Sequence, residues 1–449
     1  MPDPAVHGSH TKDSETALAP RSVSHGLGAI MRDIGYVSFG KYGQYLITLL
    51  TLPLIARVLG ADGVGLLAIG MSSYFIGSLL VDLGITPFLA ARVHDIRTTR
   101  ADLGELRGAY LAIRATTLAA LAAMLVAGTA VQVPAPVQMI LLGLFTGGFW
   151  SISEDWLLIG QGRFGTSTVY QGAGRIGYLV LLILLLPRFP SAPVVLLCML
   201  VSSMLTVALT WWDSVRTFGT PPRPRNVRAV LRIGGPILTS RALVSSYGQG
   251  SVAIYAAVLD AVSLGLYSAG DRLVRAIQSL LDPIGFALLP RMARRSTQGT
   301  FWRSSVRSLL VCVCAAVLAV AGVWLLAPLL IHVIFGDQFT GAVALLRVEV
   351  FILPATTVTS FVTTAVLPVR QDTVGVLIGA IVGTCVALIA LGIALHTRSV
   401  WTLVFGSLAA EVAVALWCLV RMRWLVLRDR AAAQRPAPAA DLIMDGGSP

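Results

Sequence analysis

The chain has 449 residues, of which 56% are hydrophobic and only 12% are charged. Soluble domains carry about 25% charged residues, so this composition excludes an ordinary soluble protein and indicates a chain that crosses a membrane many times. The formal net charge of +12 could suggest a nucleic-acid partner. Because Lys and Arg collect in the cytoplasmic loops of membrane proteins, the membrane explains this charge first, and we expect no nucleic acid.

Apolar stretches divide the chain into a polar start, two groups of helices and a polar end. A helix needs about 20 mostly apolar residues to cross the hydrocarbon core, and with this criterion the sequence predicts twelve membrane-spanning helices. We expect disordered cytoplasmic tails at both ends, an N-terminal six-helix lobe, a cytoplasmic linker rich in Pro and Arg, and a C-terminal six-helix lobe. These five parts are residues 1–28, 29–214, 215–229, 230–428 and 429–449. The helices are predicted over residues 34–58, 64–89, 108–130, 136–158, 167–187, 193–214, 230–258, 264–289, 306–334, 342–367, 373–396 and 399–422.

The distribution of Lys and Arg predicts which side of the membrane each loop faces. With the N-terminus in the cytoplasm, the external segments hold only Arg57, Arg188 and Arg398, and every other basic residue outside the helices is cytoplasmic. An even number of helices returns the C-terminus to the same side. We therefore expect a multi-pass protein of the cytoplasmic (inner) cell membrane with both termini in the cytoplasm.

Two stretches of the sequence, 200 residues apart, are closely similar. The first is ARVLGADGVGLLAIG, residues 56–70, and the second is AAVLDAVSLGLYSAG, residues 256–270; seven of the fifteen positions are identical. The shift places the first two predicted helices on the seventh and eighth, which cross the membrane in the same direction. This pattern predicts a parallel internal repeat, in which the two lobes are related by an axis along the membrane normal.

Seven basic residues fall inside predicted helices. A charge near the bilayer centre costs at least about 2.5–3.5 kcal/mol, so such a residue usually faces a cavity or a partner. Arg241 and Arg275 lie near the middle of their helices, whereas Lys41 and Arg114 lie nearer the cytoplasmic ends, from which a long side chain can reach the interface. Asp271 and Arg275 have the i, i+4 spacing of an ion pair, which is an alternative role for Arg275. The full set is Lys41, Arg114, Arg175, Arg241, Arg272, Arg275 and Arg347.

The acidic residues and cysteines give no indication of a catalytic or metal site. Asp82 and Asp282 lie near the cytoplasmic ends of equivalent helices, where we expect them to order the following loops; binding a coupling cation is the alternative. The five cysteines fall in apolar runs without metal-ligand spacing, so we expect no metal site. The predicted external segments are too short to hold catalytic groups, and the sequence therefore favours a transporter over an enzyme.

Three motifs together resemble the polysaccharide flippases of the multidrug/oligosaccharidyl-lipid/polysaccharide exporter superfamily. IARVLGADGVGLLAIGMSSYFIGSLLVDLGI resembles their first two helices, and within it Arg57, Gly60, Gly65 and Asp82 stand at motif positions. GLYSAGDRLVRAIQSLLDPIGFALLPRMAR, which contains Gly265 and Asp282, resembles their eighth helix and the loop that follows. IFGDQFTGAVALLRV resembles the junction of helices nine and ten, and the similarity covers roughly residues 30–425.

The resemblance implies two six-helix lobes around a central cavity and a flippase that moves a lipid-linked sugar to the outer leaflet by alternating access. For a polyprenyl-pyrophosphate-linked oligosaccharide, the cavity needs fixed positive charge, because Arg donates bidentate hydrogen bonds to phosphate. Candidate cavity residues are Lys41, Arg114, Arg175, Arg241, Arg272 and Arg275. No cofactor is expected, and a coupling ion, Na⁺ or H⁺, is left open. Polysaccharide polymerases or ligases would be partners downstream.

Two other transporter functions remain as alternatives. A multidrug exporter of the same superfamily would usually carry cations, which prefer an acidic cavity, so the basic residues argue against it. A lipid II flippase would share the diphosphate chemistry, but relatives of that type usually have fourteen helices, and the sequence here predicts twelve.

Overall fold

The computed structural model describes residues 27–93, 100–225, 227–294, 301–367, 370 and 372–433, and within these ranges all regular structure is helical. The first group of helices is α1 (Leu27–Asp82), α2 (Thr86–Val93), α3 (Arg100–Ala130), α4 (Ala135–Trp150), α5 (Asp155–Gly160), α6 (Phe164–Leu185) and α7 (Ala192–Phe218). The second group is α8 (Val227–Tyr247), α9 (Ser251–Tyr255), α10 (Ala261–Arg294), α11 (Phe301–Phe335), η1 (Asp337–Phe339), α12 (Ala342–Glu349), α13 (Ile352–Phe361), η2 (Val362–Val366), α14 (Thr373–Thr397) and α15 (Val400–Ala433). We call the first group the N-lobe and the second the C-lobe.

Each of the twelve predicted segments overlaps a helix of the structure, but helix ends and predicted segments do not correspond one to one. α1 contains the first predicted helix and most of the second, joined at a kink where Gly60 has φ 66°, a conformation that favours glycine. The fourth, seventh and tenth predicted helices are each broken, into α4 and α5, α8 and α9, and α12 and α13.

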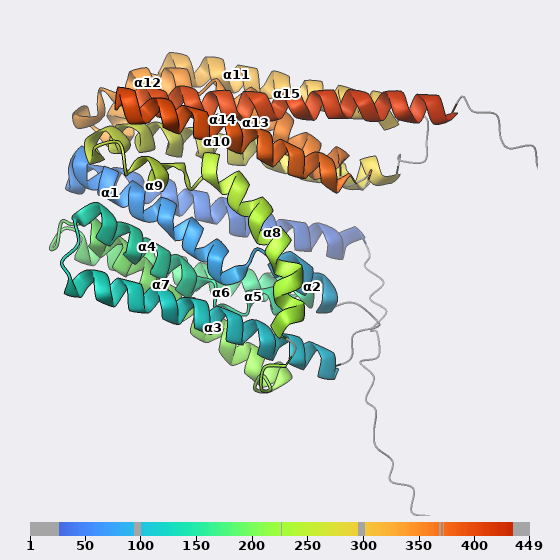
Figure 1. Cartoon of the computed structure of the whole chain (residues 1–449), viewed down its shortest axis with the longest axis horizontal. Coiled ribbons are helices and arrows are strands. Elements are labelled where there is room, and N and C mark those ends of the chain that lie inside the picture. Colours follow the sequence, from blue (N-terminus) through green and yellow to red (C-terminus); the bar gives the residue numbers. More distant parts are fainter. Residues whose placement is uncertain are drawn as a thin grey trace, which may run out of the picture.

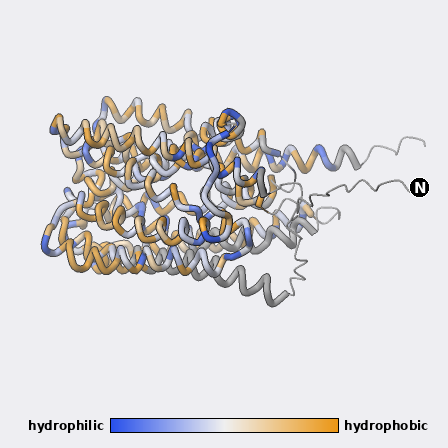
Figure 2. The backbone as a smooth tube through the Cα atoms, turned by 90° about the horizontal axis from the view of Figure 1, so that it is seen from below, coloured by the Kyte–Doolittle hydropathy of each residue, from blue (hydrophilic) through white to orange (hydrophobic). Residues whose placement is uncertain are grey.

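Long apolar helices confirm that the protein crosses a membrane several times. Among the described residues, eight helices are long and apolar enough to span a bilayer, or nine if the bent pair α12–α13 is one span. Hydrophobic residues predominate along the bundle (Figure 2). Because lipid contacts the outer surface, many of the exposed side chains on these helices are also large and apolar, such as Leu318, Leu325 and Leu388.

The helices run roughly side by side in one bundle, and α1 begins at the same end at which α15 finishes (Figure 1). We call this the tail end. We call the other end, which holds the kink at Gly60, the far end.

The buried apolar residues form one core at the far end and two cores at the tail end. The far-end core contains residues of both lobes, including Leu67 of α1, Leu196 of α7 and Leu346 of α12. Towards the tail end, one core belongs to the C-lobe, around Phe361. The other is formed mainly by the N-lobe, around Tyr110. The lobes are therefore packed together at the far end and have separate interiors at the tail end.

Helix α8 connects the two lobes near the tail end, where it crosses from one to the other (Figure 1). Val230, near its start, belongs to the N-lobe core, whereas Tyr247, at its end, belongs to the C-lobe core. A side chain at Gly234 would contact Leu83 of the N-lobe, which shows how closely α8 lies on that lobe. The sequence assigned residues 230–258 to the C-lobe, and the structure adds that the start of α8 also contacts the N-lobe core.

The predicted part boundaries shift by a few residues. Helix α1 already begins at Leu27, within the segment predicted as a tail, and α7 and α8 leave only residues 219–226 between them. Helix α15 continues to Ala433, because Asp429 forms an ion pair with Arg370 at 2.6 Å and so fixes the end that composition suggested was disordered. Residues 1–26 and 434–449, the rest of the predicted tails, lie outside the described residues.

Candidate functional site

Gly65 and Gly265 lie where α1 of the N-lobe crosses α10 of the C-lobe. A side chain at Gly65 would collide with the backbone carbonyl of Ala261, and a side chain at Gly265 would collide with the carbonyl of Ala61. Only glycine allows this approach, which is the packing role that small residues have between membrane helices. The two contacts are equivalent under the shift of 200 residues.

The other motif residues lie near loops. Arg57 donates a hydrogen bond from Nη2 to the carbonyl oxygen of Val333, at 3.3 Å, and so connects α1 to α11 at the far end. Asp82 accepts hydrogen bonds from Tyr110 Oη, at 2.5 Å, and from Thr86 Oγ1, an arrangement that orders the turn between α1 and α2. The side chain of Asp282 lies outside the described part of the chain.

Arg114 lies inside the N-lobe. Its side chain is 1% exposed, and Nη1 donates to Glu154 Oε1 at 3.0 Å, while Nη2 donates to the Ser153 carbonyl at 2.9 Å. Arg107 contacts the other oxygen of Glu154, at 3.4 Å, so that one carboxylate holds two guanidinium groups. The sequence placed Arg114 among the cavity residues; in the structure its charge instead joins α3 to the break between α4 and α5.

Arg175 and Arg272 lie on helices of different lobes, and Tyr178 connects the two helices electrostatically. Arg272, on α10, interacts electrostatically with Tyr178 of α6. Arg175 lies three residues before Tyr178, on the same face of α6, and interacts with Tyr74 of α1 and with Asp155. Both guanidinium groups are half-buried, and each extends from a long helix of a different lobe.

Arg241 lies nearer the tail end, on the bridging helix α8. Its side chain is exposed, and it lies against Gly84 in the turn after α1, where an added Cβ would come within 2.6 Å of Arg241 Cδ. The side chain of Lys41, another predicted cavity residue, lies outside the described residues.

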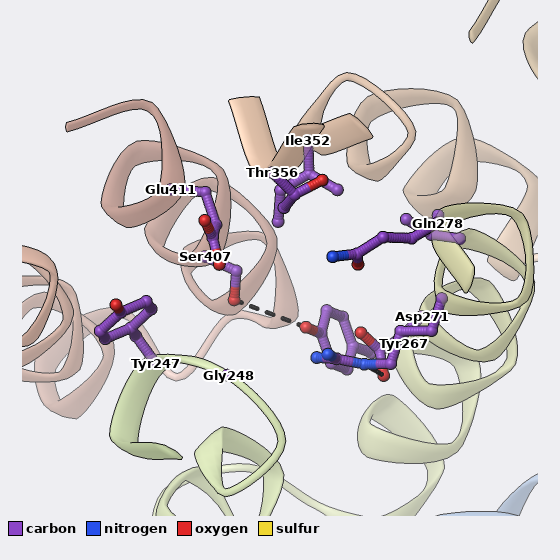
Figure 3. Close-up of a pocket in the computed structure, with 11 residues that line it drawn as sticks. Tyr247, Gly248, Tyr267, Asp271, Gln278, Ile352, Thr356, Ser407 and Glu411 are labelled. Atoms are coloured by element: carbon purple, nitrogen blue, oxygen red, sulfur yellow. Dashed lines mark hydrogen bonds and ion pairs between the residues drawn. The ribbon is translucent and has the colours of Figure 1, made fainter. Parts of the chain in front are cut away.

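Arg275 points into a pocket within the C-lobe, not into the space between lobes. The pocket has a volume of about 50 Å³, enough for roughly four water molecules but not for a sugar. Figure 3 shows side chains from α8, α10, α13 and α15 converging on it. Tyr267 and Ser407 share a hydrogen bond of 3.4 Å across it, and Arg275 Nε donates to Asp271 Oδ2 at 2.7 Å, so the i, i+4 ion pair expected from the spacing is present.

Three carboxyl groups surround Arg275. Besides Asp271, Glu411 of α15 lines the pocket, and Glu349 of α12 lies beside it, packed on the backbone of α10 at Gly270. Glu349 is 2% exposed, and its Oε2 has no hydrogen-bond partner. Arg272 also interacts with Asp271. These carboxyl groups outnumber the guanidinium groups near them even when Arg272 is counted, and an excess buried charge must be compensated.

An ion pair holds the tail end of each lobe. In the N-lobe, Arg163, just before α6, donates two hydrogen bonds to Asp213 of α7, at 2.6 and 3.0 Å. In the C-lobe, Arg421 of α15 donates two to Asp372, just before α14, at 2.7 and 3.0 Å. The two pairs join the same places in each lobe with the charges reversed. Sequence reasoning missed them because opposite residue types stand at the equivalent positions.

Comparison with known proteins places this arrangement in a known fold. The model of a family described as "Polysaccharide biosynthesis protein" matches residues 30–296. A search of curated protein sequences finds no match.

Among solved structures, the chain is similar to a lipid II flippase MurJ in an inward closed conformation, with TM-score 0.72 and 10% identity over 91% of this chain and 94% of the other. It is also similar to an inward-facing multidrug resistance MATE family transporter of the MOP superfamily, with TM-score 0.59 and 16% identity over 86% and 96%. A third match is a MOP superfamily transporter from Pyrococcus furiosus, described as having a binding pocket of reverse polarity, with TM-score 0.54 and 15% identity over 88% and 96%. At these identities the likeness shows the fold.

Proposed function

The chain belongs to the polysaccharide biosynthesis protein family, and from this premise we propose that it is a flippase for a polyprenyl-pyrophosphate-linked oligosaccharide. The observation that carries the proposal is that Arg272 of the C-lobe interacts with Tyr178 of the N-lobe helix α6, which also carries Arg175, so that each lobe contributes a cation to this region. A diphosphate between them would receive charge-assisted, bidentate hydrogen bonds from both lobes.

We propose further that all twelve predicted helices span the membrane as two parallel repeats. The reciprocal contacts of Gly65 and Gly265 support the repeat, and so do the two reversed ion pairs. With the tail end in the cytoplasm, as the Lys and Arg distribution predicts, the joint core at the far end closes the outer side, and the separate cores at the tail end correspond to an inward-facing state. Alternating access would then move the lipid-linked sugar from the cytoplasmic to the outer leaflet, where polymerases or ligases would use it.

The coupling ion is a separate proposal, and the C-lobe pocket is the place for it. Na⁺ needs several oxygen ligands, but Asp271 is already occupied by Arg275, and among the described residues no three acidic, His or Cys side chains converge as metal ligands would. The excess carboxyl group is better suited to bind a proton than to bind Na⁺. Protonation and deprotonation of Glu411 or Glu349 would change the charge balance around Arg275 without moving a ligand through the pocket.

The experiment is transport of a fluorescent polyprenyl-pyrophosphate saccharide by purified protein in liposomes. Each lost hydrogen bond to a charged group costs about 1.5–3 kcal/mol, so Arg175→Ala or Arg272→Ala should reduce transport roughly ten- to a hundred-fold. Lys at either position should restore only part of it, because Lys keeps the charge but not the planar fork. Arg188→Ala, an exposed arginine at the far end, is the matched control and should transport normally.

Complementation then separates the cargo classes. Rescue of a strain that lacks its polysaccharide flippase, without rescue of one that lacks its lipid II flippase, supports the proposal. Rescue of the second strain alone would assign lipid II. Full transport of the saccharide by both Ala variants would contradict diphosphate binding by Arg175 and Arg272. It would then favour the multidrug exporter as the alternative function.

A further inference from the structure

One side of α15 changes character along its length. Residues four apart lie in a row on a helix, and one such row begins with Val412, Leu416 and Val420, which are exposed and apolar. The same row ends with Trp424, which is 44% exposed, and Arg428, which is also exposed. At 1.5 Å per residue, the row is about 24 Å long. The apolar residues of the row could contact the acyl chains of a lipid, and Trp424 and Arg428 at its end could contact the headgroup.

Cations surround the aromatic ring at the end of this row. The guanidinium carbon of Arg421 lies 4.3 Å from the ring centroid of Trp424, and that of Arg428 lies 5.1 Å from it. Arg423, next to Trp424, is exposed. Tryptophan and arginine at a helix end are typical of the boundary between hydrocarbon and headgroups.

The end of α15 is held in place before any ligand binds. Asp372 accepts two hydrogen bonds from Arg421, Asp429 forms an ion pair with Arg370 at 2.6 Å, and Trp302 Nε1 donates to Asp429 at 3.0 Å. These contacts occupy both acidic groups of the region. Arg428 also interacts electrostatically with Asp372, but that carboxylate already accepts two hydrogen bonds from Arg421, and the exposed side chains of Arg423 and Arg428 remain accessible to an anion.

We propose that this face of α15 binds an anionic phospholipid of the leaflet at the tail end. Arg423 and Arg428 donate to the phosphate, the ring of Trp424 lies against the glycerol, and the acyl chains follow the apolar row. The continuous apolar row selects a lipid over a free anion or a nucleic acid. The two exposed cations favour an anionic headgroup over a zwitterionic one. The proposal depends on membrane insertion and not on which saccharide is transported.

The test measures lipid binding to the purified full chain in detergent by native mass spectrometry, with phosphatidylglycerol and phosphatidylcholine titrated in parallel. A basic residue near an anionic surface contributes about fivefold in affinity. Arg423→Gln combined with Arg428→Gln should therefore weaken phosphatidylglycerol binding about 25-fold. Binding of phosphatidylcholine should be weak and should not change.

Two further variants keep the test decisive. Arg188→Gln combined with Arg398→Gln removes the same charge from the far end, where both arginines are exposed, and should leave binding unchanged. Arg423→Lys combined with Arg428→Lys keeps the charge and should retain most of the affinity. Equal weakening in the far-end variant, wild-type affinity in the Gln variant, or equal binding of both lipids would each overturn the proposal.

Discussion

Gly65 of the N-lobe and Gly265 of the C-lobe meet at one helix crossing, so close that a Cβ on Gly265 would lie 3.0 Å from the backbone nitrogen of Gly65. Each glycine also faces a carbonyl of the opposite helix. The crossing lies within the core that both lobes share at the far end. If the far end is the outer side, as proposed, alternating access must separate the lobes at this crossing.

Substitutions at the crossing should therefore weaken the packed state of the far end. We expect Gly65→Val or Gly265→Val to lower the free energy of unfolding by about 1–3 kcal/mol through overpacking, or to shift the protein towards an outward-open state. Thermal unfolding measures the first effect, and access of a cysteine reagent to Ala61→Cys from the far side measures the second. Gly322→Val is the control, because nothing lies within 4 Å of an added Cβ there. Unchanged stability and unchanged access in both variants would show that the crossing is not packed as described.

Removing the charge of Glu154 should destabilise the N-lobe strongly. Glu154 holds both Arg107 and Arg114, and the three side chains are at most 3% exposed. Glu154→Gln leaves two buried cations without their carboxylate, and breaking such a group costs about 3–5 kcal/mol. Glu105→Gln removes an exposed partner of Arg225, 3.6 Å away, and should cost less than about 1 kcal/mol. Similar melting temperatures for the two variants would contradict this difference.

Reversing an ion pair at the tail end should restore what either single change removes. Arg163→Asp or Asp213→Arg alone brings like charges together, whereas the double variant recreates the pair with the polarity that the C-lobe already uses. We expect positive coupling of about 1 kcal/mol in a double-mutant cycle of thermal stability. Additive effects would show that the pair contributes no interaction energy.

The C-lobe pair should also give an acid dependence. The hydrogen bonds from Arg421 lower the pKa of Asp372 from its ordinary value. A carboxyl group whose folded-state pKa is lowered stabilises the fold above its unfolded-state pKa, and this contribution is lost as the pH falls through the folded-state pKa. Asp372→Asn should therefore reduce stability at neutral pH, and its difference from the wild type should shrink below about pH 4. A difference that stays constant with pH would contradict the assignment.

Protonation in the C-lobe pocket should control transport, if the coupling proposal holds. Glu411→Gln keeps the shape of the side chain but cannot release a proton, so we expect transport in liposomes to lose its response to an imposed pH gradient. Binding of the saccharide, measured separately, should remain, because the pocket is too small to hold it. Glu105→Gln, at the exposed pair near the linker, should respond like the wild type. A normal gradient response from Glu411→Gln would exclude this residue as the proton carrier.

The sequence by itself determined the class of the protein and the position of its helices. Every predicted segment overlaps a helix because about 20 consecutive apolar residues have no stable alternative in a membrane to a helix that satisfies its own backbone. The sequence also identified Gly65 and Gly265, since close helix approach requires glycine at the same position in both copies.

Only the tertiary structure decided which intramembrane charges have partners. Arg114, Arg275 and Arg272 have the same chemistry, but Glu154 and Asp271 form ion pairs with the first two, whereas Arg272 interacts with Tyr178 of the other lobe as well as with Asp271. Glu154 lies far from Arg114 in the chain, so spacing gave no signal for that pair, whereas the i, i+4 spacing revealed the second. Whether a buried charge is available to a ligand depends on what packs against it, and distant parts of the chain set that packing.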